Sequence, residues 1–222
     1  MSRWLLDFVA GPGDGTAAGI AGFVRLDLRE AEPVAQPAAQ PVVWYWAYLV
    51  GIPDADGVLV VRDHEVLPPR RTDPRRGLEI RADGLWAELT CETPREHWTF
   101  GLESFGVRLD AAGDALRPGG EVGERVAIGL DLEWEVGDGG PPAGIVHGDV
   151  LVGRARHAVD GRGWFYDAAD PDPEAVDGEV LATVLVPGDD EYVERRLVST
   201  ASGPRWSLTR HEYPRRARPA RC

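Results

Sequence analysis

The residues best suited to acid and base chemistry lie in two short acidic segments. The first, Asp63-His64-Glu65, places one imidazole between two carboxyl groups. A histidine beside a carboxylate can protonate an alkene or hold a catalytic water, which makes Asp63 and His64 candidate catalytic residues. In an extended chain, Asp63 and Glu65 share one face while His64 takes the other. A polar strand end that faces solvent is therefore the competing interpretation, and base rates for these residue types favour it.

The second segment, residues 85–93, alternates between apolar and polar positions as a half-buried strand does. One of its faces carries Trp86, Glu88, Thr90 and Glu92. If this face lines an enclosed space, two carboxyl groups and an indole point into it, and Glu88 and Glu92 become candidate catalytic residues. If the faces are reversed, the same side chains form a solvated outer stripe, which is the favoured interpretation.

Large aromatic side chains are the strongest indication of a ligand. The chain holds 8 Trp, and rigid indoles that expose an N–H suit a cavity that contacts an apolar molecule and orients one polar group. An aromatic face is equally a normal part of a protein core. The candidate ligand-binding residues are Trp44, Trp46, Trp86, Trp98, Glu103, Trp134, Trp164 and Tyr166.

The spacing of residues along the sequence does not indicate a metal site or a nucleotide site. The 5 His, at positions 64, 97, 147, 157 and 211, show neither the i, i+2 nor the HxxxH spacing of a local metal motif. The glycine-rich stretches 11–19 and 137–142 do not lie between a strand and a helix, so they are interpreted as turns. We therefore expect no metal ion and no cofactor.

The elements that must position these residues are β-strands. Period-two alternation dominates the chain, most clearly over residues 126–136, and helical periodicity is almost missing. Turn signals include Asp83-Gly84 and Asp160-Gly161. The predicted strands are residues 23–29, 42–50, 58–61, 78–81, 85–93, 97–104, 107–110, 126–136, 145–152, 154–159, 164–167, 178–186, 192–198 and 205–209. This spacing predicts an all-β fold, an antiparallel β-barrel or barrel-like sandwich with little helix.

Length and turn pattern indicate a single all-β domain over residues 1–214. The Gly/Pro-rich stretch 137–143 is a possible internal seam. Residues 215–222, rich in Arg and Pro and without periodicity, are expected to form a flexible tail.

Charge excludes two classes of partner. The formal net charge of -13 repels phosphate backbones and anionic lipid headgroups, so we expect no nucleic acid and no membrane partner. The basic residues are Arg throughout, a bias typical of GC-rich codon usage. Two Cys make neither a disulfide framework nor a metal quartet, and Asp7 interrupts the apolar N-terminal run that a signal peptide needs. We therefore expect a cytoplasmic protein.

Two blocks of sequence carry a resemblance to a known family. Residues 78–136 join an acidic, aromatic strand pair to the alternating strand 126–136, and residues 144–170 read GIVHGDVLVGRARHAVDGRGWFYDAAD. Together they resemble the lipocalin-like superfamily that contains the AttH proteins and the carotenoid 1,2-hydratases, or hydroxyneurosporene synthases. Many of those relatives carry a His-Ser-Trp-Gly type motif after a Gly-x-Gly turn; here Gly161-Arg162-Gly163 keeps the glycines, but the His and Ser are missing. The resemblance implies antiparallel strands around an apolar ligand cavity, whereas the missing His and Ser argue against simply carrying over the family's hydratase chemistry.

These observations predict a lipocalin-like protein that binds a small apolar molecule, terpenoid or polyketide-like, in an aromatic-lined cavity. Whether the protein is also an enzyme stays open. The activity that matches the pattern would be that of a hydratase, an isomerase or a cyclase without a metal or nucleotide cofactor. Such an enzyme would stabilise a cation on its aromatic faces. The alternative is a non-catalytic interaction module that docks a protein through residues 42–50 or through its acidic face. The oligomeric state is not set by the sequence.

Overall fold

The structure is a computed structural model of the 222-residue chain. It describes residues 2–11, 19–29, 42–53, 57–66, 77–110, 123–167, 170, 173, 175–187 and 191–212, and this part of the chain holds thirteen strands and no helix. The strands are β1 Ser2–Ala10, β2 Ala21–Arg29, β3 Val42–Val50, β4 Val58–Val66, β5 Gly77–Ala82, β6 Leu85–Thr93, β7 His97–Leu109, β8 Glu124–Val136, β9 Ala143–Val152, β10 Ala155–Tyr166, β11 Glu179–Pro187, β12 Glu191–Thr200 and β13 Gly203–Glu212. The predicted all-β fold is confirmed.

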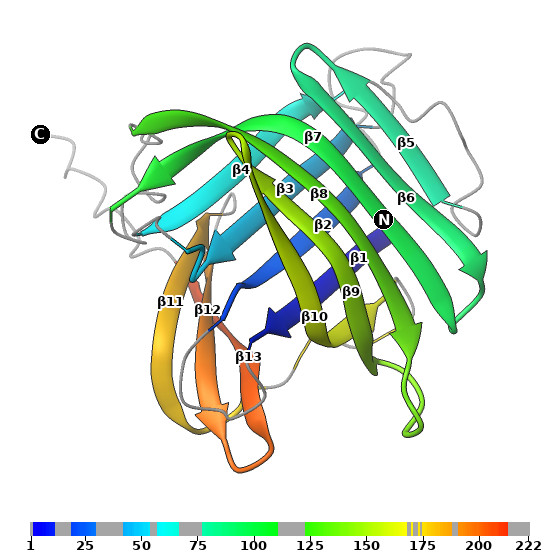
Figure 1. Cartoon of the computed structure of the whole chain (residues 1–222), viewed down its shortest axis with the longest axis vertical. Coiled ribbons are helices and arrows are strands. Elements are labelled where there is room, and N and C mark those ends of the chain that lie inside the picture. Colours follow the sequence, from blue (N-terminus) through cyan, green and yellow to red (C-terminus); the bar gives the residue numbers. More distant parts are fainter. Residues whose placement is uncertain are drawn as a thin grey trace, which may run out of the picture.

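The strands form a closed antiparallel barrel made of two meanders (Figure 1). Strands β1 to β4 pair in chain order, and so do β7 to β10. The meanders join where β1 pairs β10 and where β4 pairs β7 through Val58 to Val60. Strands β5 and β6 extend the sheet from the first half of β7. Closure gives each of the eight barrel strands, β1 to β4 and β7 to β10, a neighbour on both sides. The barrel therefore lacks the exposed edges of an open sheet.

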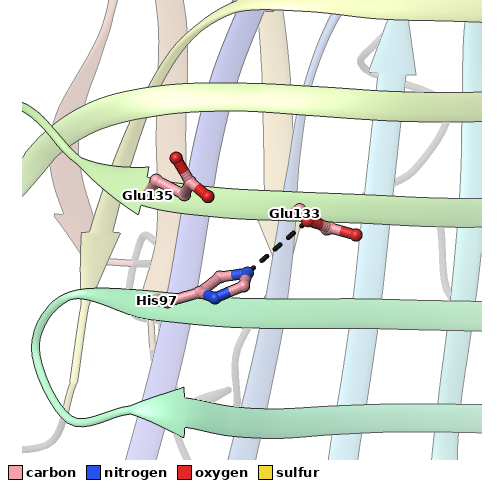
Figure 2. A group of neighbouring side chains, drawn as sticks. All are labelled: His97, Glu133 and Glu135. Atoms are coloured by element: carbon pink, nitrogen blue, oxygen red, sulfur yellow. Dashed lines mark ion pairs between the residues drawn. The ribbon is translucent and has the colours of Figure 1, made fainter.

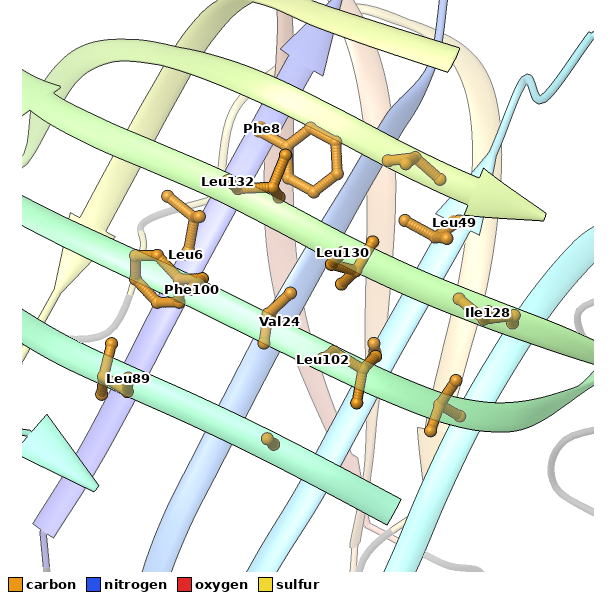
Figure 3. Packing of buried hydrophobic residues seen from close by; sticks show 14 of the residues in the cluster. Leu6, Phe8, Val24, Leu49, Leu89, Phe100, Leu102, Ile128, Leu130 and Leu132 are labelled. Atoms are coloured by element: carbon orange, nitrogen blue, oxygen red, sulfur yellow. The ribbon is translucent and has the colours of Figure 1, made fainter. Parts of the chain in front are cut away.

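Alternation along the strands fills the barrel with apolar side chains. On β8 the inward positions Ile128, Leu130, Leu132 and Trp134 are buried, while the residues between them point outward. Figure 3 shows how side chains from β1, β2 and β3 meet those from β6, β7 and β8 across the interior. These residues belong to one continuous apolar cluster, so the hydrophobic effect closes the barrel around them.

A second, three-stranded sheet of β11, β12 and β13 covers part of the barrel's outer face. Its apolar side chains pack against the outward side chains of β1 to β4 and β10 in a second buried cluster. The indole of Trp206 on β13 contacts the ring of Phe23 edge-on at 5.5 Å and donates a hydrogen bond of 3.2 Å to the carbonyl of Phe8. The outer face of these strands is therefore core as well.

A buried ion pair joins the two sheets. Asp7 on β1 accepts a hydrogen bond from Arg195 on β12, and both side chains are almost completely buried. The Arg195 guanidinium also lies 4.3 Å from the ring of Phe23 and 5.8 Å from that of Trp206. Burial raises the pKa of Asp7 above its ordinary value, and Arg195 opposes that rise.

Some predicted strand ends are wrong, and glycines within the strands are the reason. Asp160-Gly161 is not a turn, because β10 runs unbroken from Ala155 to Tyr166, and β7 is one strand where two were expected. A Cβ on Gly161 would lie 2.2 Å from the carbonyl oxygen of Val9, and one on Gly106 would lie 2.3 Å from Ile128 Cδ1. These glycines allow close approach inside the barrel instead of reversing the chain.

Other boundaries follow the sequence. The turn at Asp83-Gly84 joins β5 to β6 as predicted, and residues 137–142, within the possible seam, connect β8 to β9. The sequence pattern does not predict β1, since residues 4–8 are buried on both faces and show no alternation. The Arg/Pro-rich residues 215–222 lie outside the described part. Among the described residues, no helix is long and apolar enough to cross a membrane.

Candidate functional site

A groove of about 500 Å³ lies where the sheet divides, near the β5–β6 and β9–β10 turns. β7 pairs with β6 as far as Ser104 and with β4 from Val107 onward. Because the two partners separate around Phe105, side chains from both faces of the sheet reach the groove. Its lining residues are Gly84, Leu85, Trp86, Glu103, Ser104, Phe105, Ala127, Ile128, Gly129, Leu151 and Gly153.

The groove is mostly apolar with few polar groups. Phe105 and Leu151 are 52% and 41% exposed, which is unusual for such side chains. Glu103 lies directly across the strand pair from Trp86, and the Ser104 hydroxyl donates to the carbonyl of Gly84 at 3.1 Å. A site of this size and composition suits one small apolar molecule with a single polar end.

A glycine lets Trp86 lie against the sheet. A Cβ on Gly101, which lies on β7 opposite Glu88 and diagonal to Trp86, would approach the indole to 2.9 Å. The Arg125 guanidinium lies 4.5 Å from the centroid of the Phe105 ring, which also lines the groove. The groove is therefore bordered by an indole that rests on a glycine and by a phenyl ring that a cation covers.

The barrel interior holds two of the predicted ligand-binding indoles, but they take part in close packing. Trp98 and Trp134 contact the central Phe165 ring at centroid distances of 4.8 and 5.4 Å. One enclosed space in this interior, lined in part by Tyr45 and Leu130, offers about 10 Å³ to the centre of a water molecule. That volume accommodates about one water. The Tyr45 hydroxyl is buried and has no hydrogen bond to any residue that the structure describes, and burial raises the pKa of Tyr45.

The carboxyl groups of β6 point away from the interior. Leu85, Ala87 and Leu89 are buried inside, so Glu88 is half-buried on the outer face and Glu92 is exposed. Glu88 accepts a hydrogen bond of 3.1 Å from the Thr90 hydroxyl. The outer stripe is thus the arrangement that the structure shows, with Glu92 exposed, while Glu88, half-buried on the same face, also borders the small interior space.

The remaining candidates are dispersed. Asp63, His64 and Trp44 have side chains outside the described residues, although their backbone belongs to β4 and β3. The indole of Trp46 is buried on the outer face of β3, under the second sheet. Trp164 and Tyr166 are buried on the outer face of β10, and the Arg205 guanidinium lies 5.3 Å from the Trp164 ring. Of the predicted residues whose side chains are described, the groove thus brings together only Trp86 and Glu103.

The structure also assembles a histidine and carboxylate cluster that sequence spacing does not reveal. His97, Glu133 and Glu135 offer ligand atoms that all lie within 4.8 Å of one another (Figure 2). His147 reaches Glu133 from the other side, with 3.2 Å between Nε2 and Oε2. These residues come from β7, β8 and β9, so only the pairing register between strands could have indicated the cluster.

Comparison with protein families, curated proteins and solved structures finds no match to this chain. The groove and the histidine cluster therefore rest on the geometry of the chain itself.

Proposed function

We propose that this protein binds a small apolar molecule, terpenoid or polyketide-like and bearing one polar group, in the groove formed by β6 to β9. The observation that carries the proposal is an open volume of about 500 Å³ bordered by Trp86, Phe105 and Leu151. Ligand pockets for small molecules span roughly 300–1,000 Å³ and combine apolar walls with a few polar groups. The enclosed interior space of about 10 Å³ is too small for such a molecule.

The proposal keeps the lipocalin-like, AttH-related kinship expected from the sequence and moves the ligand from the interior to the groove. In this arrangement Trp86 and Phe105 contact the apolar body, while the Glu103 carboxylate accepts a hydrogen bond from its polar group. An enzyme that protonates a double bond would need an acid at the ligand, and Glu103 is the titratable side chain that lines the described groove.

The alternative function is docking of a protein partner through residues 42–50, and the structure gives it little support. The side chains of residues 45–50 are all buried inside the chain, either in the barrel or under the second sheet. This segment of β3 therefore offers no free surface to a partner.

A binding measurement with a neutral fluorescent probe tests the proposal. N-phenyl-1-naphthylamine should gain fluorescence on binding, and terpenoid or polyketide-like competitors should displace it. Leu151→Ala and Trp86→Ala should weaken binding roughly tenfold, as expected when a contacting apolar side chain is removed. Ile145→Ala is the matched control, because Ile145 is 53% exposed on the same strand as Leu151 but does not line the groove. Equal affinity in L151A, W86A and the wild type would exclude the groove as the site.

A further inference from the structure

A second site lies on the outer face of the barrel at the opposite end of β7 from the groove. His97 begins β7 and Phe105 is eight residues further along, which is about 26 Å in a strand. His97 lies directly opposite Glu135 on β8, and Glu133 lies directly opposite His147 on β9. All four side chains share the outer face, because the residues between them on β8, Leu132 and Trp134, are buried inside.

We propose that His97, Glu133 and Glu135 bind a divalent transition-metal ion of the zinc type. His97 Nε2 lies 3.5 Å from Glu133 Oε2. Two ligand atoms of one tetrahedral zinc ion, each bound at roughly 2.1 Å, are about 3.4 Å apart. This pair therefore already has the spacing of two ligands of one ion, and Glu135 offers an oxygen within 4.8 Å of both atoms.

The surroundings of His97 fit a metal ligand. Its Nε2 atom is shielded from solvent and makes no hydrogen bond within the described part of the chain, although a carboxylate oxygen lies nearby. A shielded ring nitrogen that has only a 3.5 Å ion-pair contact lacks a good hydrogen bond, and a bound cation would use its lone pair. An ion between His97 Nε2 and Glu133 Oε2 would give that nitrogen a ligand bond and leave the oxygen its contact with His147.

His147 is the positioning residue of the site. Its Nε2 atom lies 3.2 Å from Glu133 Oε2, within hydrogen-bond distance. A hydrogen-bond donor to a ligating carboxylate fixes the direction of that ligand, and such partners typically change metal affinity by roughly 10–100-fold. The third strand, β9, thus orients a ligand that β8 supplies.

The ligand set and its surroundings favour a transition metal over the hard cations. Imidazole binds zinc, copper, nickel and iron well, whereas Mg²⁺ and Ca²⁺ take oxygen ligands. Asp131 and Asp149 lie opposite each other on β8 and β9 on the same face, where Asp149 is paired with Arg156. With three protein ligands from two neighbouring strands, one coordination position stays open for water.

Calorimetry on the full chain without a histidine tag, freed of metal by a chelator, tests the site with Zn²⁺ alone. We expect one Zn²⁺ per chain, a loss of affinity of at least roughly tenfold in His97→Ala and Glu133→Gln, and about tenfold in His147→Ala. His211→Ala is the matched control, since His211 Nε2 also lies close to a carboxylate oxygen, 2.9 Å from Glu194 Oε2, but this pair is on β12 and β13 and Arg196 shares the carboxylate. Its affinity should equal that of the wild type.

Two further measurements separate a site from nonspecific binding. Zn²⁺ should raise the melting temperature of the wild type and of H211A but not of H97A, because only a ligand that binds the folded state stabilises it. X-ray absorption at the zinc edge should show one imidazole among oxygen ligands. Absence of Zn²⁺ binding, or equal binding in the wild type and H97A, would mean that the cluster is an ion pair only.

Discussion

At the scale of single residues, the strongest constraint is the contact between Asp7 and Arg195. Burying two charges costs several kcal/mol for each ion, and their attraction offsets this only when both are present. Arg195 also packs between Phe23 and Trp206, so its aliphatic stem and its charge both contribute. Removal of the arginine leaves a carboxylate in the core with a raised pKa.

We predict that Arg195→Met destabilises the fold by about 3–5 kcal/mol at neutral pH, because Asp7 is then buried without its partner. A carboxyl group whose folded-state pKa is raised adds stability below its unfolded pKa, and this stability is lost as the pH rises through the folded value. R195M should therefore be more destabilised near pH 7 than near pH 4, since the lost arginine raises that pKa further. Urea unfolding at both pH values measures the difference.

The double variant Asp7→Leu, Arg195→Met is the control for this prediction. Replacing both charges with apolar side chains removes the unpaired carboxylate, so the variant should regain most of the stability that R195M loses. A double variant as unstable as R195M, with no dependence on pH, would show that the packing of the arginine stem matters more than the charge.

At the scale of elements, β10 shows how glycine shapes a barrel strand. Gly163 faces the interior, where the Trp134 indole lies against it and donates a hydrogen bond of 3.4 Å to its carbonyl. A Cβ at Gly163 would come within 2.1 Å of Val146 Cγ2 and 2.9 Å of Trp134 Cδ1. The strand thus lies close to its neighbours because this position carries no side chain.

We predict that Gly163→Ala costs about 1–3 kcal/mol, the usual effect of overpacking a core. Gly139→Ala is the matched control, because a Cβ there meets nothing within 4 Å, and its stability should stay within about 0.5 kcal/mol of the wild type. Chemical denaturation of the two variants measures both values. Equal stability of G163A and G139A would mean that Val146 and Trp134 adjust freely.

The strands and turns also show which features of the structure could be predicted from the sequence. The alternation of residues 126–136 predicts β8 closely, and Asp83-Gly84 predicts the β5–β6 turn, because both signals are local. The direction in which Glu88 points depends on which face of β6 meets the core, and that is settled only by packing. Likewise, the groove at Phe105 and the cluster around Glu133 arise from pairings between strands, which no spacing along the chain encodes.

At the scale of the whole molecule, the barrel and the second sheet share their stabilising contacts. Phe23 and Trp46 lie on the outside of the barrel, yet they are as buried as the residues inside it. Exposing this face would return large aromatic surfaces to water at roughly 25 cal/mol per Å². Without β11 to β13, the barrel would therefore carry a broad apolar patch.

Because the two sheets share buried contacts, we predict that they unfold as one cooperative unit. The backbone amides of Leu130 in β8 and Leu197 in β12 should exchange hydrogen with the same opening free energy, equal to the global value, because the buried contacts that hold β12 also hold the barrel. Hydrogen exchange read by mass spectrometry or NMR measures both amides. R195M should lower the two opening free energies by the same amount. If β12 exchanged at a lower free energy than β8, the second sheet would be a separate unit that docks on a barrel stable by itself.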